Sequence, residues 1–166
     1  YFLEKFVHFF HIPLQSGSNK ILSFMKRVHN REDMLARTKK IHNINKHAFL
    51  ATDIIVGFLG ETDEDFKETY DFLAESPISK FHVFRFSKRN QTAAFFMANR
   101  IKEPSEKAKK ERSQALIDLS AEKYQHFQES LIGYESEALV IEKKRGKYYR
   151  ALLNNQMPVL MKDKNI

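Results

Sequence analysis

A single carboxylate interrupts one of the most apolar stretches of the sequence. Asp53 lies in the run Thr52-Asp-Ile-Ile-Val-Gly57, where an unpaired, buried carboxylate would be destabilising by several kcal/mol. Alternate residues of a strand share a face, so Asp53 would lie with Ile55 and Gly57. Two interpretations stay open. Either Asp53 borders a ligand beside Gly57, or it is a structural carboxylate bonded to a neighbouring strand or loop.

An apolar run nearer the start of the chain carries two histidines. His11 shares a face with Gln15 by the same alternation, which makes His11 a possible partner of Asp53. His8 lies three residues before His11 and would face the opposite way on a strand, so a metal site made by this pair is disfavoured. The other histidines are scattered along the chain, and the sequence assigns them no role.

Polar or glycine-containing segments follow three successive apolar runs, at residues 14–18, 57–61 and 87–92. In a parallel sheet or barrel, the carboxyl ends of the strands meet at one rim, where ligands bind. Glycines in such loops let a flat ligand approach the backbone, while amide and hydroxyl side chains offer hydrogen bonds. One such loop alone is more simply a turn. Three on successive strands favour a binding site.

The elements that must position these loops are strands and the helices between them. Residues 6–14, 49–57 and 81–86 are rich in Phe, Val and Ile and do not alternate cleanly with polar residues. This pattern is typical of strands that are covered on both faces, as in a parallel sheet. The sequence therefore predicts three such strands.

Helix-start signals separate the three predicted strands. Asn30 stands three residues before Asp33, and Thr62 stands three residues before Asp65, as N-cap residues do. Another helical segment follows residues 16–18. The resulting order βα(α)βαβ predicts an α/β fold in which parallel strands are joined by right-handed crossovers.

The pattern changes beyond residue 92. Residues 104–106, Pro-Ser-Glu, open a long predicted helix, and Gly133 is a credible stop for it. Two short β-like segments follow, at residues 135–142 and 148–153. We expect them to begin a small basic β module.

The charge of the chain favours an anionic partner. Its 166 residues contain 28 Lys and Arg against 21 Asp and Glu, a net charge of +7, which attracts nucleic acid first. Residues 143–150 mix cations with tyrosine rings, as RNA-binding surfaces do, although a charged hairpin tip is the commoner explanation. The solvated face of the long helix is expected to carry Lys107, Lys109 and Lys110. The candidate RNA-binding residues are Lys143, Lys144, Arg145, Lys147, Tyr148 and Arg150.

Composition excludes several classes of site within this sequence. There is no cysteine, so the sequence itself offers no disulfide, zinc–thiolate site or thiolate ligand for an iron–sulfur cluster. The longest strongly apolar run, residues 54–59, is far too short to span a membrane. The chain opens without methionine inside a strand-like run, which predicts that it is part of a longer protein.

Three motifs resemble those of a known enzyme family. They are His11-Ile-Pro-Leu-Gln-Ser-Gly-Ser18, Thr52-Asp-Ile-Ile-Val-Gly-Phe-Leu-Gly-Glu-Thr62 and His82-Val-Phe-Arg-Phe-Ser-Lys-Arg89. In this order and spacing they closely resemble the radical SAM methylthiotransferases, most of all the branch that acts on threonylcarbamoyladenosine in tRNA. The resemblance implies the later half of a partial (β/α) TIM-like barrel at residues 1–132. A partial TRAM-like RNA-binding β module would follow at residues 133–166.

The same resemblance implies an activity and its partners. Such an enzyme adds a methylthio group to carbon 2 of the modified adenosine beside the anticodon, using S-adenosylmethionine and [4Fe–4S] clusters. The cluster cysteines would lie upstream of this chain, so the chain alone is predicted to be inactive. The implied partners are S-adenosylmethionine and the anticodon stem-loop of tRNA, the implied location is the cytoplasm, and the oligomeric state stays open.

The resemblance also carries roles to individual residues. Gln15 and Ser16 would reach the ribose or methionyl part of S-adenosylmethionine, and Asp53 with the glycine-containing loop after it would border the cofactor and its adenine. Leu59 and Gln91 depart from the family, which usually has proline and glycine there. The candidate cofactor-binding residues are Gln15, Ser16, Asp53, Gly57, Gly60, Glu61, Ser87 and Arg89.

Two other functions compete with this one. The chain could be a non-catalytic RNA-binding protein whose α/β part is only a scaffold. It could also belong to the ribosomal-protein branch of the same enzyme family, in which the terminal module would grip a protein. Cysteines spaced Cys-x-x-x-Cys-x-x-Cys upstream of the chain would favour the enzyme over the scaffold.

Overall fold

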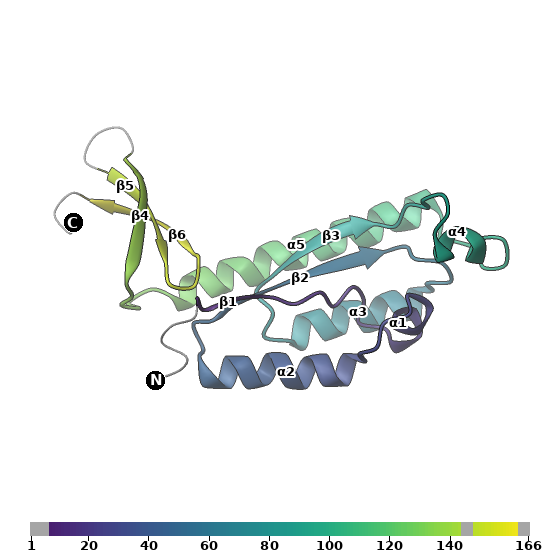
Figure 1. Cartoon of the computed structure of the whole chain (residues 1–166), viewed down its shortest axis with the longest axis horizontal. Coiled ribbons are helices and arrows are strands. Elements are labelled where there is room, and N and C mark those ends of the chain that lie inside the picture. The colour runs from purple at the N-terminus through teal and green to yellow at the C-terminus, as the bar shows by residue number, and fades with distance from the viewer. Residues whose placement is uncertain (1–6, 144–147, 163–166) are drawn as a thin grey trace.

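The computed structural model describes residues 7–143 and 148–162. Figure 1 shows a three-stranded sheet with helices packed along it, and a second three-stranded sheet at one end of the molecule. The elements in chain order are β1 (Phe9–His11), α1 (Asn19–Phe24), α2 (Arg31–Ile44), β2 (Phe49–Val56), α3 (Asp63–Glu75), β3 (Lys80–Arg85), α4 (Ala93–Met97), α5 (Glu106–Ser130), β4 (Ala138–Lys143), β5 (Tyr148–Leu153) and β6 (Pro158–Lys162).

The first sheet is parallel, with the strand order β1-β2-β3, which confirms the predicted α/β class. Within the described residues, β1 is shorter than the predicted strand 6–14. It ends before Pro13, which has no N–H to donate to a neighbouring strand. The chain rejoins β2 once more at Gln15, which forms an isolated parallel bridge with Ile54.

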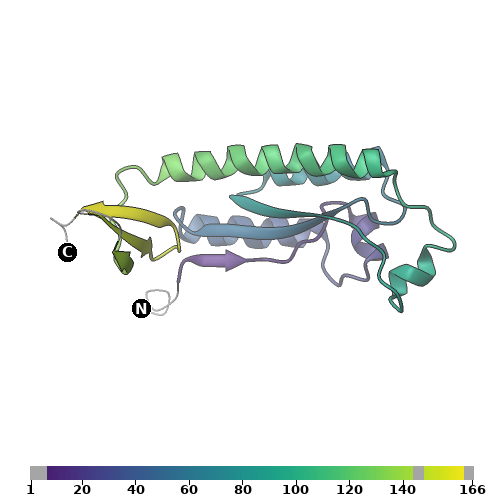
Figure 2. The ribbon, with the colours of Figure 1, turned by 90° about the horizontal axis from the view of Figure 1, so that it is seen from above.

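Within residues 7–143 and 148–162, helices cover one face of this sheet and leave the other without a helix. Ile54 and Val56 of β2 lie in a core with Leu73 of α3 and Leu116 of α5, and α5 runs alongside β3 in both views (Figures 1 and 2). The opposite face is open, and Phe84 on it is 52% exposed. The prediction that these strands are covered on both faces is therefore wrong.

The predicted helix starts are confirmed. Asn30 accepts a hydrogen bond from the Asp33 backbone N–H at 2.8 Å, and Thr62 and Asp65 form a reciprocal capping box. Ser105 caps α5. The five-residue helix α4 was not predicted. No helix in the described part of the chain is both long enough and apolar enough to cross a membrane.

The second sheet is antiparallel, with the order β4-β5-β6. The two predicted β segments correspond to β4 and β5, whereas β6 was not predicted. Asn155 joins this sheet to the rest of the molecule by donating a hydrogen bond to the backbone oxygen of His47 at 2.9 Å, and Met157 packs with Phe127 and Phe49. The division of the chain at residue 132 stays a prediction.

Candidate functional site

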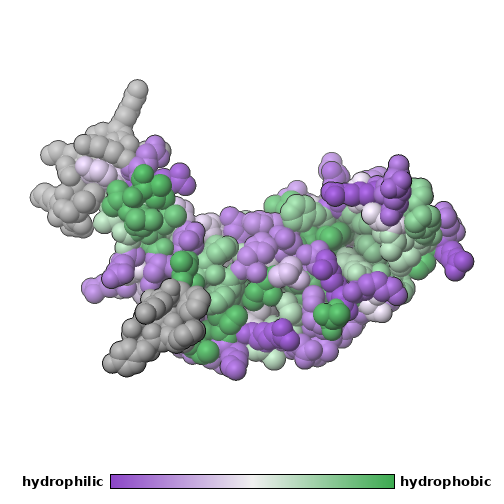
Figure 3. Space-filling view, viewed as in Figure 1, coloured by the Kyte–Doolittle hydropathy of each residue, from purple (hydrophilic) through white to green (hydrophobic). Residues whose placement is uncertain are grey.

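A cavity of about 530 Å³ lies at the carboxyl ends of the parallel strands. Aromatic side chains line one part of it, and the Phe58 and Phe86 rings meet edge to face with centroids 4.8 Å apart. Figure 3 shows apolar surface bordered by strongly hydrophilic residues at the α4 end of the molecule. The cations that line the cavity are Lys26, Arg27, Arg85 and Arg89. Such a site suits a partly apolar ligand that carries a negative group.

Four of the predicted cofactor-binding residues line this cavity, namely Gln15, Asp53, Ser87 and Arg89. Gln15 is fixed there by the backbone. Its backbone N–H donates to the backbone oxygen of Asp53 at 2.9 Å, and its backbone oxygen accepts from the Ile55 N–H at 2.9 Å. The backbone of Gln15 has a φ of 73°, a left-handed conformation that residues other than glycine seldom adopt. All three predicted loops therefore reach one cavity, the second of them through Phe58.

The other four predicted residues do not line the cavity. Ser16 is fully buried, and its hydroxyl lies 3.2 Å from the Thr69 hydroxyl of α3. A Cβ atom added to Gly60 would meet the Phe24 ring at 2.9 Å. Gly57 and Glu61 face α5 instead. These residues shape the loops from behind, and any cofactor contact by their side chains stays a prediction.

Buried charges hold the loop between β2 and α3. One Glu61 carboxylate oxygen accepts hydrogen bonds from the Gly57 N–H at 2.7 Å and from Arg112 of α5 at 2.6 Å. Arg112 also binds Asp63 at 2.7 Å. Burial raises the pKa of the Glu61 carboxyl, whereas the Gly57 N–H and Arg112 favour its charged form. Arg112 was missed in the sequence analysis, because its partners Glu61 and Asp63 lie far away along the chain.

Lys109 of α5 packs against the same loop. Its side chain is 3% exposed, lies against Gly57, and forms ion pairs with Glu103 at 3.1 Å and Glu106 at 2.7 Å. The prediction that this lysine belongs to a solvated helix face is therefore wrong. The alkyl stem packs on the loop while the ammonium group reaches the two carboxylates.

Asp65 ties the loop after β1 to the start of α3. Its carboxylate accepts from the Ser18 hydroxyl at 2.9 Å, from Lys20 at 2.6 Å and from the Thr62 N–H at 2.9 Å. Burial alone would raise the pKa of Asp65, but these donors outweigh it and hold the pKa below its ordinary value. The side chain that caps α3 therefore also fixes the segment that carries Gln15.

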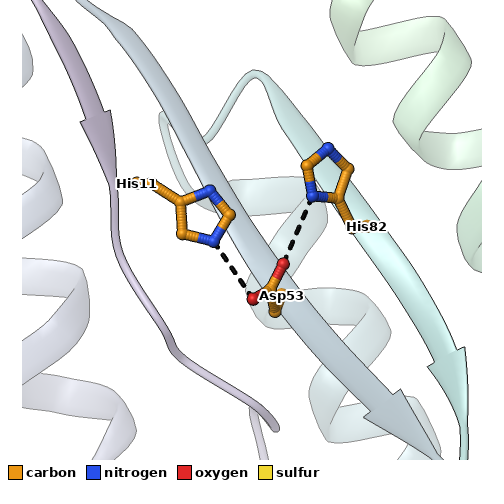
Figure 4. Close-up of side chains that lie close together, drawn as sticks. All are labelled: His11, Asp53 and His82. Atoms are coloured by element: carbon orange, nitrogen blue, oxygen red, sulfur yellow. Dashed lines mark hydrogen bonds and ion pairs between the residues drawn. The ribbon is translucent and has the colours of Figure 1, made fainter.

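On the open face of the sheet, Asp53 stands between two histidines (Figure 4). His11 Nε2 lies 3.1 Å from Asp53 Oδ2, and His82 Nδ1 lies 3.3 Å from Asp53 Oδ1. The predicted partnership of Asp53 with His11 is confirmed. His82 was missed, although it is the direct β3 neighbour of Asp53. The strand register would have identified it.

The loop after β3 is exposed. Ser87 and Arg89 are both exposed, while Lys88 forms an ion pair with Glu103 at 3.2 Å. Thr92 ends the loop by accepting from the Phe95 N–H at 3.2 Å, which starts α4. The side chains of this loop are therefore free to meet a ligand in the cavity.

Three of the six predicted RNA-binding residues, and the side chain of a fourth, lie outside the described part of the chain. This holds for Lys144, Arg145 and Lys147 and for the side chain of Lys143. Tyr148 and Arg150 are exposed on β5, and the Lys162 ammonium lies 5.9 Å from the centre of the Tyr148 ring. RNA binding by this segment stays a prediction.

Comparison with known proteins defines the class of the fold. Residues 2–73 match the model of the radical SAM superfamily. The archaeal Methanocaldococcus infernus Elp3 with an N-terminal deletion has a similar fold, with a TM-score of 0.50 and 12% identity, over 93% of this chain and 48% of that chain. The chain thus has a radical SAM-like α/β fold with a parallel sheet.

Relatives narrow the class to a family. The chain is 42% identical over 142 residues to the threonylcarbamoyladenosine tRNA methylthiotransferase MtaB of Aquifex aeolicus, covering 86% of this chain and 34% of that protein. It is 40% identical over 144 residues to the tRNA-2-methylthio-N(6)-dimethylallyladenosine synthase of Pelotomaculum thermopropionicum, covering 86% and 32%. The chain belongs to the radical SAM methylthiotransferase family. It spans about a third of the length of these relatives.

Proposed function

We propose that the chain is part of a cytoplasmic tRNA-modifying enzyme that adds a methylthio group to carbon 2 of threonylcarbamoyladenosine beside the anticodon. The observation that carries the proposal is the cavity at the strand ends, lined by residues of all three motifs that resemble the family. The similarity to MtaB of Aquifex aeolicus supports this choice of substrate.

We propose that the cavity holds part of S-adenosylmethionine. Its volume of about 530 Å³ suits a ligand of this size, and its aromatic wall suits an adenine ring. Gln15 would bind the ribose or methionyl part, Asp53 would border the adenine side, and Ser87 with Arg89 would close the third side. When bound in such enzymes, S-adenosylmethionine supplies the radical that abstracts hydrogen from the substrate.

The predicted residues that do not line the cavity would act by holding its loops in place. Ser16, Gly57, Gly60 and Glu61 would keep the loops in place through their hydrogen bonds and close packing. In this proposal Asp65 and Arg112 share that task, because each joins a cavity loop to a helix.

The residues of this chain do not fit a [4Fe–4S] cluster, because the sequence contains no cysteine. We therefore assign the cluster to other parts of the protein and expect the chain alone to leave S-adenosylmethionine intact. The test is an anaerobic, reducing incubation of the purified chain, followed by measurement of 5′-deoxyadenosine. Formation of this product would contradict the assignment.

Mass spectrometry of tRNA nucleosides tests the substrate. A strain that lacks the complete gene is expected to lose the methylthio form of threonylcarbamoyladenosine. Loss of the methylthio form of isopentenyladenosine would instead favour a second candidate function, the modification of that nucleoside. The similarity to the tRNA-2-methylthio-N(6)-dimethylallyladenosine synthases supports this second candidate. If tRNA is unchanged, both fail, and the ribosomal-protein or non-catalytic function takes their place.

We further propose that the antiparallel sheet is a TRAM-like module that contacts the anticodon stem-loop. Tyr148 and Arg150 offer a ring and a cation on one strand, a combination that suits RNA. Binding of an anticodon stem-loop is expected to weaken steeply as salt rises. The substitution Arg150→Gln should weaken binding of the stem-loop relative to the wild-type chain at the same salt concentration. Equal affinity of the variant and the wild type would contradict the proposal.

A further inference from the structure

The open face of the parallel sheet carries a cluster that the proposed cofactor site does not use fully. His11, Asp53 and His82 come from β1, β2 and β3 (Figure 4), and their ligand atoms all lie within 4.8 Å of one another. His11 and His82 do not line the cavity. Asp53 lines the cavity and belongs to both.

The cluster is built on a rigid frame. Asp53 and His82 are direct neighbours in the β2–β3 ladder, and His11 pairs with Ala51, two residues before Asp53. Backbone hydrogen bonds of three adjacent strands therefore fix the spacing of the three side chains. Only side-chain rotation remains to be adjusted when a ligand binds, which lowers the entropy lost on binding.

Two features suit this cluster to a metal ion. Its donors are two imidazole nitrogens and a carboxylate, which together favour zinc and similar ions over magnesium or calcium. Two ligands that each lie about 2.1 Å from one ion are at most about 4.2 Å apart. The observed spread of up to 4.8 Å thus needs only a small rotation of the rings.

The cluster is also accessible. The side chains of His11, Asp53 and His82 are 35%, 31% and 51% exposed, so an ion can enter from solvent. Three protein ligands leave at least one position for water or for an oxygen of a molecule in the cavity, as in metal sites that act on ligands. A purely structural zinc site would be closed by four protein ligands.

We propose that His11, Asp53 and His82 bind a divalent transition-metal ion of the zinc type, with an open position beside the cavity. The ion replaces the two histidine–aspartate contacts and changes the local charge from that of one carboxylate to a net positive value. It would then attract an anionic or oxygen-bearing group of a molecule held in the cavity. The proposal needs no bound cofactor, so its failure would leave the proposed S-adenosylmethionine site untouched.

The test uses the complete 166-residue chain without a histidine tag. Zn²⁺ is titrated by calorimetry, and Co²⁺ is followed by its visible absorption. Because the sequence has no cysteine, thiolates cannot contribute to either signal. One Zn²⁺ per chain is expected to bind, and Mg²⁺ is expected to bind far more weakly. Absence of saturable Zn²⁺ binding would overturn the proposal.

Matched variants locate the ion. His82→Gln and His11→Gln should each weaken Zn²⁺ binding by about tenfold or more, while His126→Gln, on an exposed part of α5, should leave it unchanged. Circular dichroism checks that each variant is folded. Both ligand positions are partly exposed, and two independent variants keep the test decisive if one fails to fold. Unchanged Zn²⁺ affinity in a folded His82→Gln or His11→Gln variant would contradict the site.

Discussion

The loop after β2 and the loop after β3 occupy equivalent places at the ends of neighbouring strands, yet they are built differently. In the first, Glu61 is 5% exposed and bonded to Arg112. In the second, Ser87 and Arg89 are exposed and line the cavity. The polar side chains of the first loop therefore lie behind the cavity, to which this loop contributes Phe58, whereas those of the second loop line it. The position of a residue at the end of a strand does not by itself decide whether its side chain lines the cavity.

The difference comes from what covers each loop. α5 places Lys109 and Arg112 over the first loop, where they meet its carboxylate and glycine. The second loop is held mainly through Lys88 and through Thr92, which caps α4. We therefore expect substitutions in the first loop to affect folding stability, and substitutions in the second to affect ligand binding.

The largest effect on stability is expected for Arg112→Met. The Arg112 and Glu61 side chains are 8% and 1% exposed, so the variant leaves a buried carboxylate without its charged partner. Urea unfolding should show a loss of about 3–5 kcal/mol. Lys107→Met is the matched control, because Lys107 is 85% exposed on the same helix. A loss under about 1 kcal/mol for Arg112→Met would mean that the buried pair does not hold the loop.

Gly57→Ala should follow with a loss of about 2–3 kcal/mol. Gly57 has a φ of +76°, and an added Cβ would overlap the Lys109 stem. Gly133 offers a control, with a φ of +83° and no atom within 4 Å of an added Cβ. Gly133→Ala therefore reports backbone strain alone, about 1 kcal/mol. Equal losses for the two variants in thermal or urea unfolding would exclude the packing contribution of Lys109.

Asp65→Asn should lower stability by about 2 kcal/mol at neutral pH. The folded-state pKa of Asp65 is lowered by the hydrogen bonds that outweigh burial. Its stabilising contribution is therefore present above the unfolded-state pKa of about 3.9 and is lost as pH falls through the lower folded-state pKa. The gap between wild type and variant in urea unfolding should shrink below about pH 4. Asp118→Asn, at an exposed position of α5, is the control, and a gap independent of pH would contradict this role.

Arg89→Ala should have the smallest effect on stability, within about 0.5 kcal/mol of the wild type, because Arg89 is exposed. In the complete enzyme the same variant should raise the concentration of S-adenosylmethionine needed for half-maximal activity. A stability loss comparable with that of Arg112→Met would erase the distinction between the two loops.

Short-range sequence patterns predicted the helix starts and the parallel strands. Asn30 and Thr62 marked helix starts because capping depends only on residues a few positions away. Strand alternation put His11 on the face of Gln15, which made it a possible partner of Asp53, and the two side chains do meet. His82 was missed because its role depends on the register between β2 and β3, and alternation within one strand carries no register.

Tertiary packing explains the wrong predictions. Lys109 is a charged residue in a helix with many charged residues, and only its position over Gly57 makes it buried. The open face of the sheet was likewise predicted to be covered, because apolar residues such as Phe84 occur on both faces. The motifs predicted loops that do reach the cavity, but they could not separate cavity-facing side chains from those that support the loops.

The proposed binding of part of S-adenosylmethionine in the cavity at the strand ends can be measured on the chain itself. The most direct measurement is a titration of the isotopically labelled chain with S-adenosylhomocysteine, followed by amide chemical shifts in nuclear magnetic resonance. We predict shifts that saturate at Gln15, Asp53, Ser87 and Arg89, with Gly133 and the strands β4–β6 unchanged. Saturating shifts confined to β4–β6, or no shifts at millimolar ligand, would contradict the claim.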